Sequence, residues 1–374
     1  MESKRILPIT CNKDTQLSFH LSAVLSDDMK AWFYNRFINI RCWGIDLVVV
    51  DFMDNVIDDS YRDLFDERIC YDPQRVPNGR RLIKSLKRNL CKDFYSYLWI
   101  DKYEIPGSDE YHISNFIHPI LIYGYDDASE NFFIENFTPS KGSYLTTVHY
   151  SELCAAYDAV IADLPGLQIA NGSDIIRTDF RLNRQKAPHR FDIVKFTAEL
   201  SNYIFSRPDV TQYVNSAVYF GMDVYKSLLR VCDEAELGTE LTFKSLHDLE
   251  LHKQFILERL SFVSRNYLVS SKFMECVDKY CEVVRIYRTI VLTNIKFQMR
   301  EKNDIASFST NPIFIEKMRS LLLKAQRIEK ECLISVYSEL IDGVRYIDNI
   351  FCKNIVECTE YKYTDTSVYA KTDS

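Results

Sequence analysis

Glycine is scarce in this sequence, at 10 of 374 residues, well under the roughly 7% of an average protein. That scarcity excludes collagen-like and glycine-rich low-complexity chains. Neither G-x-G-x-x-G nor a P-loop pattern occurs, which argues against a nucleotide cradled by glycines. Basic residues are also few, because 46 Lys and Arg stand against 53 Asp and Glu, for a formal net charge of -7. We therefore expect no nucleic-acid partner.

Long apolar runs are absent too. The opening segment is broken by Pro8 and is too short for a signal peptide, and no run of 18 apolar residues follows. We therefore expect a cytoplasmic protein with no membrane partner. In a reducing compartment the 11 cysteines are expected to be thiols. None of them forms C-x-x-C, so the sequence predicts no structural metal.

The two halves of the chain differ in character. After Pro208 the only proline is Pro312, and apolar residues recur at steps of three and four in patterns typical of amphipathic helices, near 191–205, 217–232, 246–267, 273–291 and 314–332. The first half carries short aromatic or β-branched runs typical of strands, at 45–52, 94–100, 117–125 and 132–137, with helical patterns at 18–25 and 80–90. The sequence predicts an α+β chain with a mixed domain over 1–165, a helical domain over 166–358 and a disordered tail over 359–374.

The most informative segment is 116–137, where two strand-like runs flank a polar turn and predict a β-hairpin. With the turn centred on Asp127, His118 lies opposite Asn136 on the same face of the sheet. An amide in that place can fix the tautomer of an imidazole, as in a Cys-His-Asn arrangement. Cys11 is the candidate nucleophile, because it lies just before a helical run, where a helix N-terminus lowers the pKa of a thiol.

Other polar residues offer weaker alternatives. His112 and His149 are the alternatives to His118 as the base. Asn12 and Gln16 are candidates for a donor that stabilises the oxyanion. The segment from His247 to His252 contains metal-ligand types, but its two histidines are five residues apart and point different ways on a helix, which leaves an incomplete pair.

Several motifs together resemble one known family. They are the opening from Cys11 to Leu25, the run His118-Pro-Ile-Leu-Ile-Tyr-Gly-Tyr-Asp126 followed by Phe133-Ile-Glu-Asn-Phe137, and two helical motifs at 219–228 and 251–260. In their order and spacing these motifs are similar to the butirosin biosynthesis protein H family, and the resemblance spans most of the chain.

The resemblance implies a papain-like (bacteriocin-peptidase-like) N-terminal domain with an antiparallel sheet. It also implies an acyltransferase or amide synthetase in thiotemplated natural-product biosynthesis. Such an enzyme takes an acyl group from the phosphopantetheine of an acyl or peptidyl carrier protein and passes it to a small amine, without a cofactor of its own. By position, Cys11 matches the nucleophile, His118 the base and Asn136 the orienting residue, for which many members have Asp.

Two further readings and one expectation about the acceptor complete the hypothesis. A cysteine protease would use the same nucleophile and base, and a non-catalytic scaffold of an assembly line would use neither. For an enzyme, the net negative charge and carboxylates expected near the site would attract a cationic amine, in particular a diamine. Those carboxylates are Asp126, Asp127, Glu130 and Glu135.

Overall fold

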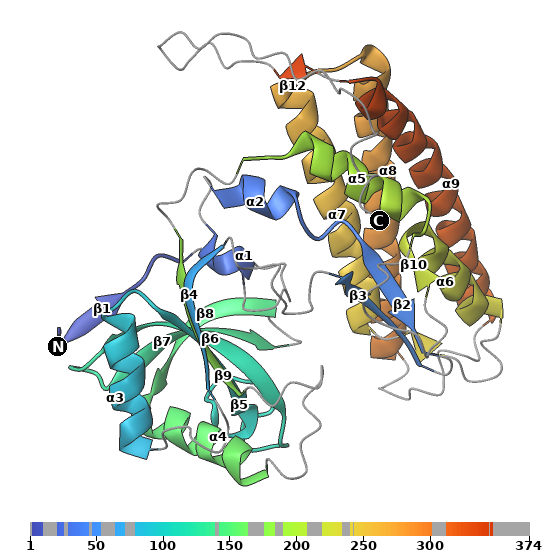
Figure 1. Ribbon diagram of the computed structural model, residues 1–374. Helices are drawn as coiled ribbons and strands as arrows, with labels where there is room; N and C mark the ends of the chain where they lie inside the picture. The colour runs from blue at the N-terminus through green and yellow to red at the C-terminus, as the bar shows by residue number, and fades with distance from the viewer. Residues whose placement is uncertain are drawn as a thin grey trace, which may run out of the picture. The chain divides into compact units, whose positions relative to one another are not determined.

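The computed structural model describes residues 2–9, 21–25, 29–44, 47–53, 64–71, 79–138, 142–163, 176–183, 190–207, 219–233, 240–241, 243–300, 312–343 and 345–346. These residues form helices and mainly antiparallel sheet, which confirms the predicted α+β class (Figure 1). The chain divides into two compact units. The first comprises Met1–Trp32 and Asn55–Arg190, and the second Phe33–Asp54 and Phe191–Ser374.

A seven-stranded antiparallel sheet forms the centre of the first unit, in the order β4-β9-β5-β6-β7-β8, with β1 also paired to β6. The strands are β1 (Lys4–Ile6), β4 (Phe65–Tyr71), β5 (Tyr95–Asp101), β6 (Ile117–Asp126), β7 (Asn131–Thr138), β8 (Gly142–His149) and β9 (Arg177–Leu182). Strands β6 and β7 form the predicted hairpin, with residues 127–130 as its turn. Strand β6 is therefore an internal strand, flanked by β5 and β7.

Helices cover this sheet and close its core. Helix α3 (Gly79–Leu90) is the predicted 80–90 helix, and it buries Leu82, Leu86 and Leu90 at steps of four while its charged residues lie on other faces. It packs with α4 (Tyr150–Asp163) against β5. The short helix α1 (Leu21–Val24) lies within the predicted 18–25 helix.

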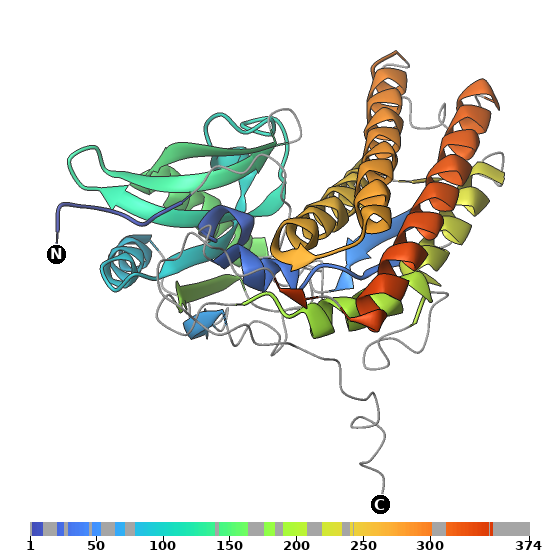
Figure 2. The same ribbon diagram turned by 90° about the horizontal axis from the view of Figure 1, so that it is seen from above.

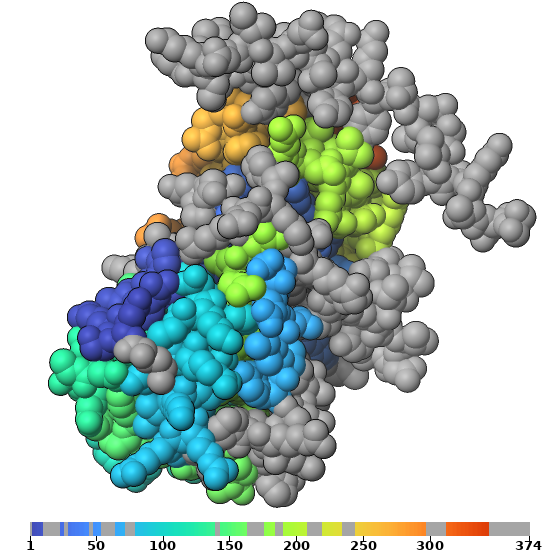
Figure 3. Space-filling view, turned by 60° about the vertical axis from the view of Figure 1, so that its left-hand side comes forward, coloured from blue at the N-terminus to red at the C-terminus, as the bar shows by residue number. Residues whose placement is uncertain are grey.

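The first residues of the chain lie on the surface of this unit. Figure 3 shows them in dark blue beside the cyan and green segments, where Lys4 pairs with Asp126 and Arg5 pairs with Asp93. Gly124 of β6 permits this close approach, because a Cβ atom there would lie 2.6 Å from the carbonyl oxygen of Arg5. Strand β1 therefore fixes where the chain enters the sheet.

The described residues of the second unit include the helices α5 (Ile193–Ile204), α6 (Val224–Asp233), α7 (Phe243–Asn266), α8 (Ser271–Arg300) and α9 (Pro312–Asp342). The three long helices α7, α8 and α9 pack side by side in sequence order, and α5 and α6 pack on α9 (Figures 1 and 2). Their buried residues follow the predicted spacing; on α9, for example, Phe314, Met318 and Ala325 are buried. All five predicted helical patterns are thus confirmed, the 217–232 pattern only from Val224 onward.

The second unit also contains a small sheet. Its order is β10 (Tyr219–Phe220), β2 (Ile40–Trp43), β3 (Leu47–Phe52) and β11 (Glu240–Leu241). Helix α7 packs on β3, where the Ser245 hydroxyl donates to the carbonyl of Val48 (3.2 Å) and accepts from the amide of Val50 (3.0 Å). A further antiparallel pair is formed by β12 (Tyr267–Leu268), which follows α7, and β13 (Arg345–Tyr346), which follows α9.

These units differ from the predicted division at residue 165. Strand β9 lies beyond that residue but belongs to the sheet of the first unit, where it pairs with both β4 and β5. Strand β3, near the start of the chain, belongs to the second unit because its buried residues pack under α7. Both strands belong to these units because they pair with or pack on segments that are distant in sequence. The proposed tail, 359–374, lies outside the described residues.

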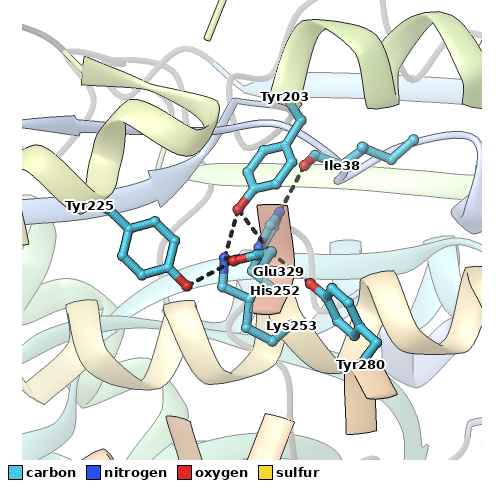
Figure 4. Close-up of polar contacts among 7 residues, drawn as sticks. All are labelled: Ile38, Tyr203, Tyr225, His252, Lys253, Tyr280 and Glu329. Atoms are coloured by element: carbon cyan, nitrogen blue, oxygen red, sulfur yellow. Dashed lines mark hydrogen bonds and ion pairs between the residues drawn. The ribbon is translucent and has the colours of Figure 1, made fainter. Parts of the chain in front are cut away.

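A charged cluster lies buried among the helices of the second unit (Figure 4). The carboxylate of Glu329 accepts hydrogen bonds from Tyr203 (3.0 Å), Tyr225 (2.8 Å) and Tyr280 (2.7 Å), and the Lys253 ammonium lies 3.0 Å away. Both members of this ion pair are fully buried. We call these five residues the buried tyrosine cluster. It joins α5, α6, α7, α8 and α9 through one carboxylate.

Candidate active site

Pro119 interrupts the hydrogen bonding of β6 in the interior of the sheet. On the β5 side it pairs with Trp99, whose amide donates to the Ile176 carbonyl (2.9 Å), in the direction of β9. Trp99 and Pro119 therefore form a pair without mutual hydrogen bonds, and the nitrogen and carbonyl of Pro119 face β7. Proline has no N–H to offer there. The β6–β7 pairing ends accordingly at Leu121 and Glu135.

Three side chains occupy the hydrogen-bonding groups that a regular rung between Pro119 and Phe137 would have used. His118 Nδ1 lies 3.0 Å from the Pro119 carbonyl oxygen. The Phe137 amide donates to Oδ1 of Asn136 (2.9 Å), and the Lys102 ammonium donates to the Phe137 carbonyl. The break in the sheet is therefore fully satisfied, and it gathers an imidazole, an amide and an ammonium in one place.

The imidazole of His118 is half-buried and held in one orientation. Its ring stacks on the rings of Phe116 and Phe137, with a centroid separation of 5.6 Å and an interplanar angle of 21° in each case. A carbonyl oxygen can only accept a hydrogen bond, so Nδ1 carries the proton in the contact with Pro119. The lone pair of the neutral ring is then on Nε2, as a general base requires.

Asn136 does not have the position that the hairpin register predicted. Paired residues sum to 257 near the turn and to 256 past a bulge between Ile122 and Gly124, rather than to 254. The prediction that His118 lies directly opposite Asn136 is wrong, because the turn spans 127–130 and the bulge shifts the register again. Continued by one pair, the observed register aligns Asn136 with Ile120.

The side chain of Asn136 anchors a loop instead. It is fully buried, and its Nδ2 donates to the hydroxyl oxygens of Ser108 (3.2 Å) and Tyr144 (2.9 Å). Tyr144 in turn donates to the Gly107 carbonyl (3.1 Å). Asn136 therefore ties the segment 105–116 to β7 and β8. The group that orients His118 is the Pro119 carbonyl, whose role was not predicted from the sequence.

Lys102 is the residue of this site that sequence reasoning missed. It begins the short 3-10 turn Lys102–Glu104 after β5 and is fully buried. Its Nζ lies 5.7 Å from the ring centroids of both Phe116 and Phe137. Burial lowers the pKa of Lys102 to about 8, although Glu110 and Asp109 act to raise it. The signal for it was Pro119, since a proline within an apolar strand requires a hydrogen-bond donor from elsewhere.

The carboxylates expected near the site are elsewhere. Asp126 is eight residues from His118 on an extended strand, about 26 Å away. It pairs with Lys4, Asp127 pairs with Lys87, and Glu130 lies 3.3 Å from the imidazole of His149. The expectation that these three lie at the site is therefore wrong, because the turn and His118 are at opposite ends of the hairpin. Glu135, the fourth, is fully buried in β7.

The other candidates have separate positions. His112 is exposed with φ of 54°, and its ring centroid lies 4.0 Å from the Tyr111 ring centroid at an interplanar angle of 51°. His149 lies 2.7 Å from the Ser151 hydroxyl. His252 donates through Nε2 to the Ile38 carbonyl (2.8 Å), and burial lowers its pKa far below the usual value, so it is neutral. Within the described ranges, no three His, Cys, Asp or Glu residues are grouped to hold a metal ion.

Cys11 lies outside the described residues, as do Asn12 and Gln16. The eight cysteines that the structure does describe are all free thiols. Among the described helices, none is long and apolar enough to cross a membrane.

Comparison with known proteins adds no relative. Neither the scan against protein-family models nor the search of curated proteins gives a match to this chain. The family resemblance of the motifs therefore stays a hypothesis, and the case for function depends on the residues around His118.

Proposed function

We propose that the first unit is a papain-like cysteine acyltransferase in which Cys11 is the nucleophile and His118 the general base. The observation that carries the proposal is the setting of His118. Its ring is stacked on two phenyl rings and its Nδ1 proton is directed at the Pro119 carbonyl, so the lone pair of the neutral ring is on Nε2. A histidine that only packs in a strand does not need such an orienting contact. A histidine that serves as the base of a Cys–His pair does need it.

The chemistry needs only a thioester and an amine. The Cys11 thiolate attacks the thioester carbonyl, a C–S bond forms, and the carrier thiol leaves with the proton that His118 had accepted. The amine then attacks the acyl-enzyme, the Cys11 C–S bond breaks, and His118 returns the amine proton to the thiolate. No ATP is required, because the thioester already carries the activation. This is the reaction of an amide synthetase, and the sequence motifs suggest one like that of closthioamide biosynthesis.

Chain length permits the pairing of Cys11 with His118. The Leu7 amide donates to the Tyr123 carbonyl (2.8 Å), so the chain lies beside β6 at that point. Cys11 follows four residues later, and four residues span up to about 14 Å. Tyr123 and His118 are five residues apart on the strand, roughly 16 Å. The two side chains cover the remaining distance.

Intact-mass analysis tests the proposal directly. The full chain is incubated with hexanoyl-pantetheine thioester, without amine and then with a diamine. We expect one hexanoyl adduct that maps to Cys11 and disappears when amine is added. His118→Ala should slow both adduct formation and release.

The control is Cys70→Ala, which removes an exposed thiol of the same unit. We expect this variant to acylate like the wild type, whereas Cys11→Ala gives no adduct. Full turnover by Cys11→Ala would refute the mechanism. Release of the acyl group to water alone, with a peptide cleaved in parallel, would favour a cysteine protease instead.

A further inference from the structure

We propose that Lys102 is a positioning residue for His118: its ammonium takes the place of the N–H that Pro119 lacks and keeps the Phe137 backbone and ring against the imidazole. The inference deepens the proposed function and rests on it for the role of His118 as a base. The contacts of Lys102 do not depend on that role, because they all involve described residues.

The Phe137 carbonyl lacks a donor from the neighbouring strand. In a regular rung the Phe137 carbonyl would accept from the residue opposite on β6, but that residue is a proline. A buried carbonyl without a donor is unfavourable, because it has lost its hydrogen bond to water without a replacement. Lys102 supplies the donor from the end of β5. The lysine side chain thus donates the hydrogen bond that the backbone of the neighbouring strand cannot donate.

Lys102 and His118 also share two aromatic neighbours. The Lys102 ammonium lies 5.7 Å from the centroids of Phe116 and Phe137, and His118 stacks on the same two rings. The ammonium and the imidazole therefore lie within about 11 Å of one another. A cation at that separation disfavours the imidazolium, so Lys102 also helps to keep His118 neutral.

Lys102 has no carboxylate at ion-pair distance among the described residues, although the charges of Glu110 and Asp109 act on it from farther away. Within the described part of the chain it forms no ion pair, and its one hydrogen bond goes to a carbonyl. A buried ammonium without a carboxylate is expensive. The presence of a lysine here is therefore explained by its contacts with Phe116 and Phe137 beside His118, and not by a gain in stability.

The test separates the donor from the charge. In Lys102→Met both are lost, in Lys102→Arg both are kept, and in the double variant Pro119→Ala, Lys102→Met a backbone N–H is restored to the rung. The readout is the titration of His118 followed by NMR of the full chain labelled with ¹³C-histidine, with His118→Gln used for assignment. This measurement does not depend on acyl transfer, so it can fail or succeed separately from the proposed function.

We expect Lys102→Met to raise the pKa of His118 by about 0.3 to 1.2 pH units, from the loss of one positive charge near 10 Å. Its ring resonances should also broaden, since the Phe137 backbone is no longer held. Lys102→Arg should retain the wild-type titration. The double variant should recover the sharp resonances but keep the raised pKa. The other titratable groups on elements around the site are unchanged in every variant: Asp101, Glu104, Asp109, Glu110, His112, Glu135 and Tyr144.

Lys87→Met is the matched control, because Lys87 also lies over two aromatic rings, at Tyr125 and Tyr150, but at the turn end of the hairpin. It should leave His118 unchanged. An unchanged His118 titration and line width in Lys102→Met would overturn the proposal. If Lys102→Met does not fold, recovery of folding by Pro119→Ala supports the missing-donor argument, and failure to recover refutes it.

Discussion

Removal of the Glu329 carboxylate should strongly destabilise the second unit. In Glu329→Gln the Lys253 ammonium is left fully buried without its counter-charge, which lies 3.0 Å away in the native protein. At that distance and an effective dielectric constant near 20, the lost attraction is about 5 kcal/mol. Measured losses for breaking a buried pair are of the same order, about 3–5 kcal/mol. The glutamine keeps the shape, and its one carbonyl oxygen can still accept from Tyr203 and Tyr280. Its amide nitrogen cannot accept from Tyr225, so the loss includes one hydrogen bond as well as the charge.

The assay is urea unfolding of the full chain, with Trp43 as the probe because it is the one tryptophan in the sequence of the second unit. Variants carry Phe at Trp32 and Trp99 so that the other unit is silent. We expect the double variant Lys253→Met, Glu329→Gln to recover at least about 2 kcal/mol relative to the sum of the two single losses, since no charge is then left unpaired.

The matched control is Glu331→Gln, also on α9, which breaks the exposed pair with Lys279 of α8 (2.7 Å). An exposed pair contributes little, so this variant should unfold close to the wild-type midpoint. Equal losses in Glu329→Gln and Glu331→Gln, or additive single losses in the cycle, would refute the argument that burial makes this ion pair indispensable.

Three further outcomes follow from single side chains. Burial lowers the pKa of His252 far below 6.5, so below pH 6.5 only the unfolded chain takes up this proton. The free energy of unfolding should therefore fall by about 1.4 kcal/mol for each pH unit below 6.5. Denaturation of the wild type and of His252→Gln from pH 7 to pH 5 isolates this slope. Asn136→Ala should lower the melting temperature, because Asn136 anchors a loop, whereas His118→Ala should lower activity with little effect on melting. Gly221→Ala should destabilise far more than Gly79→Ala by urea unfolding: both glycines have positive φ, but only at Gly221 would a Cβ meet a backbone atom, at 2.2 Å.

The local patterns of the chain were predictable from the sequence. Spacings of three and four predicted the long helices, and alternating apolar runs around a polar turn predicted the β6–β7 hairpin. The register was not predictable, because it depends on a four-residue turn and on the bulge after Ile122. A bulge depends on contacts across the sheet rather than on the sequence of one strand.

The candidate site was predictable in part for the same reason. His118 stood out through its strand and its neighbours in sequence. Lys102 did not, because its role depends on the order of β5, β6 and β7 in the sheet, which brings the end of one strand to the carbonyl of Phe137. The division of the chain at 165 failed likewise, since β9 joins the first sheet through pairs with residues more than 75 positions away.

Lys102 and Lys253, both buried, differ in how their charge is balanced. Lys253 faces a carboxylate and three tyrosine rings, so its site is complete. Lys102 has a carbonyl and two phenyl rings, and burial lowers its pKa to about 8. A fold selected only for stability would replace such a lysine by an apolar residue and Pro119 by one with an N–H. That both are present next to an oriented imidazole is the strongest physical reason to regard this break in the sheet as a candidate site of chemistry.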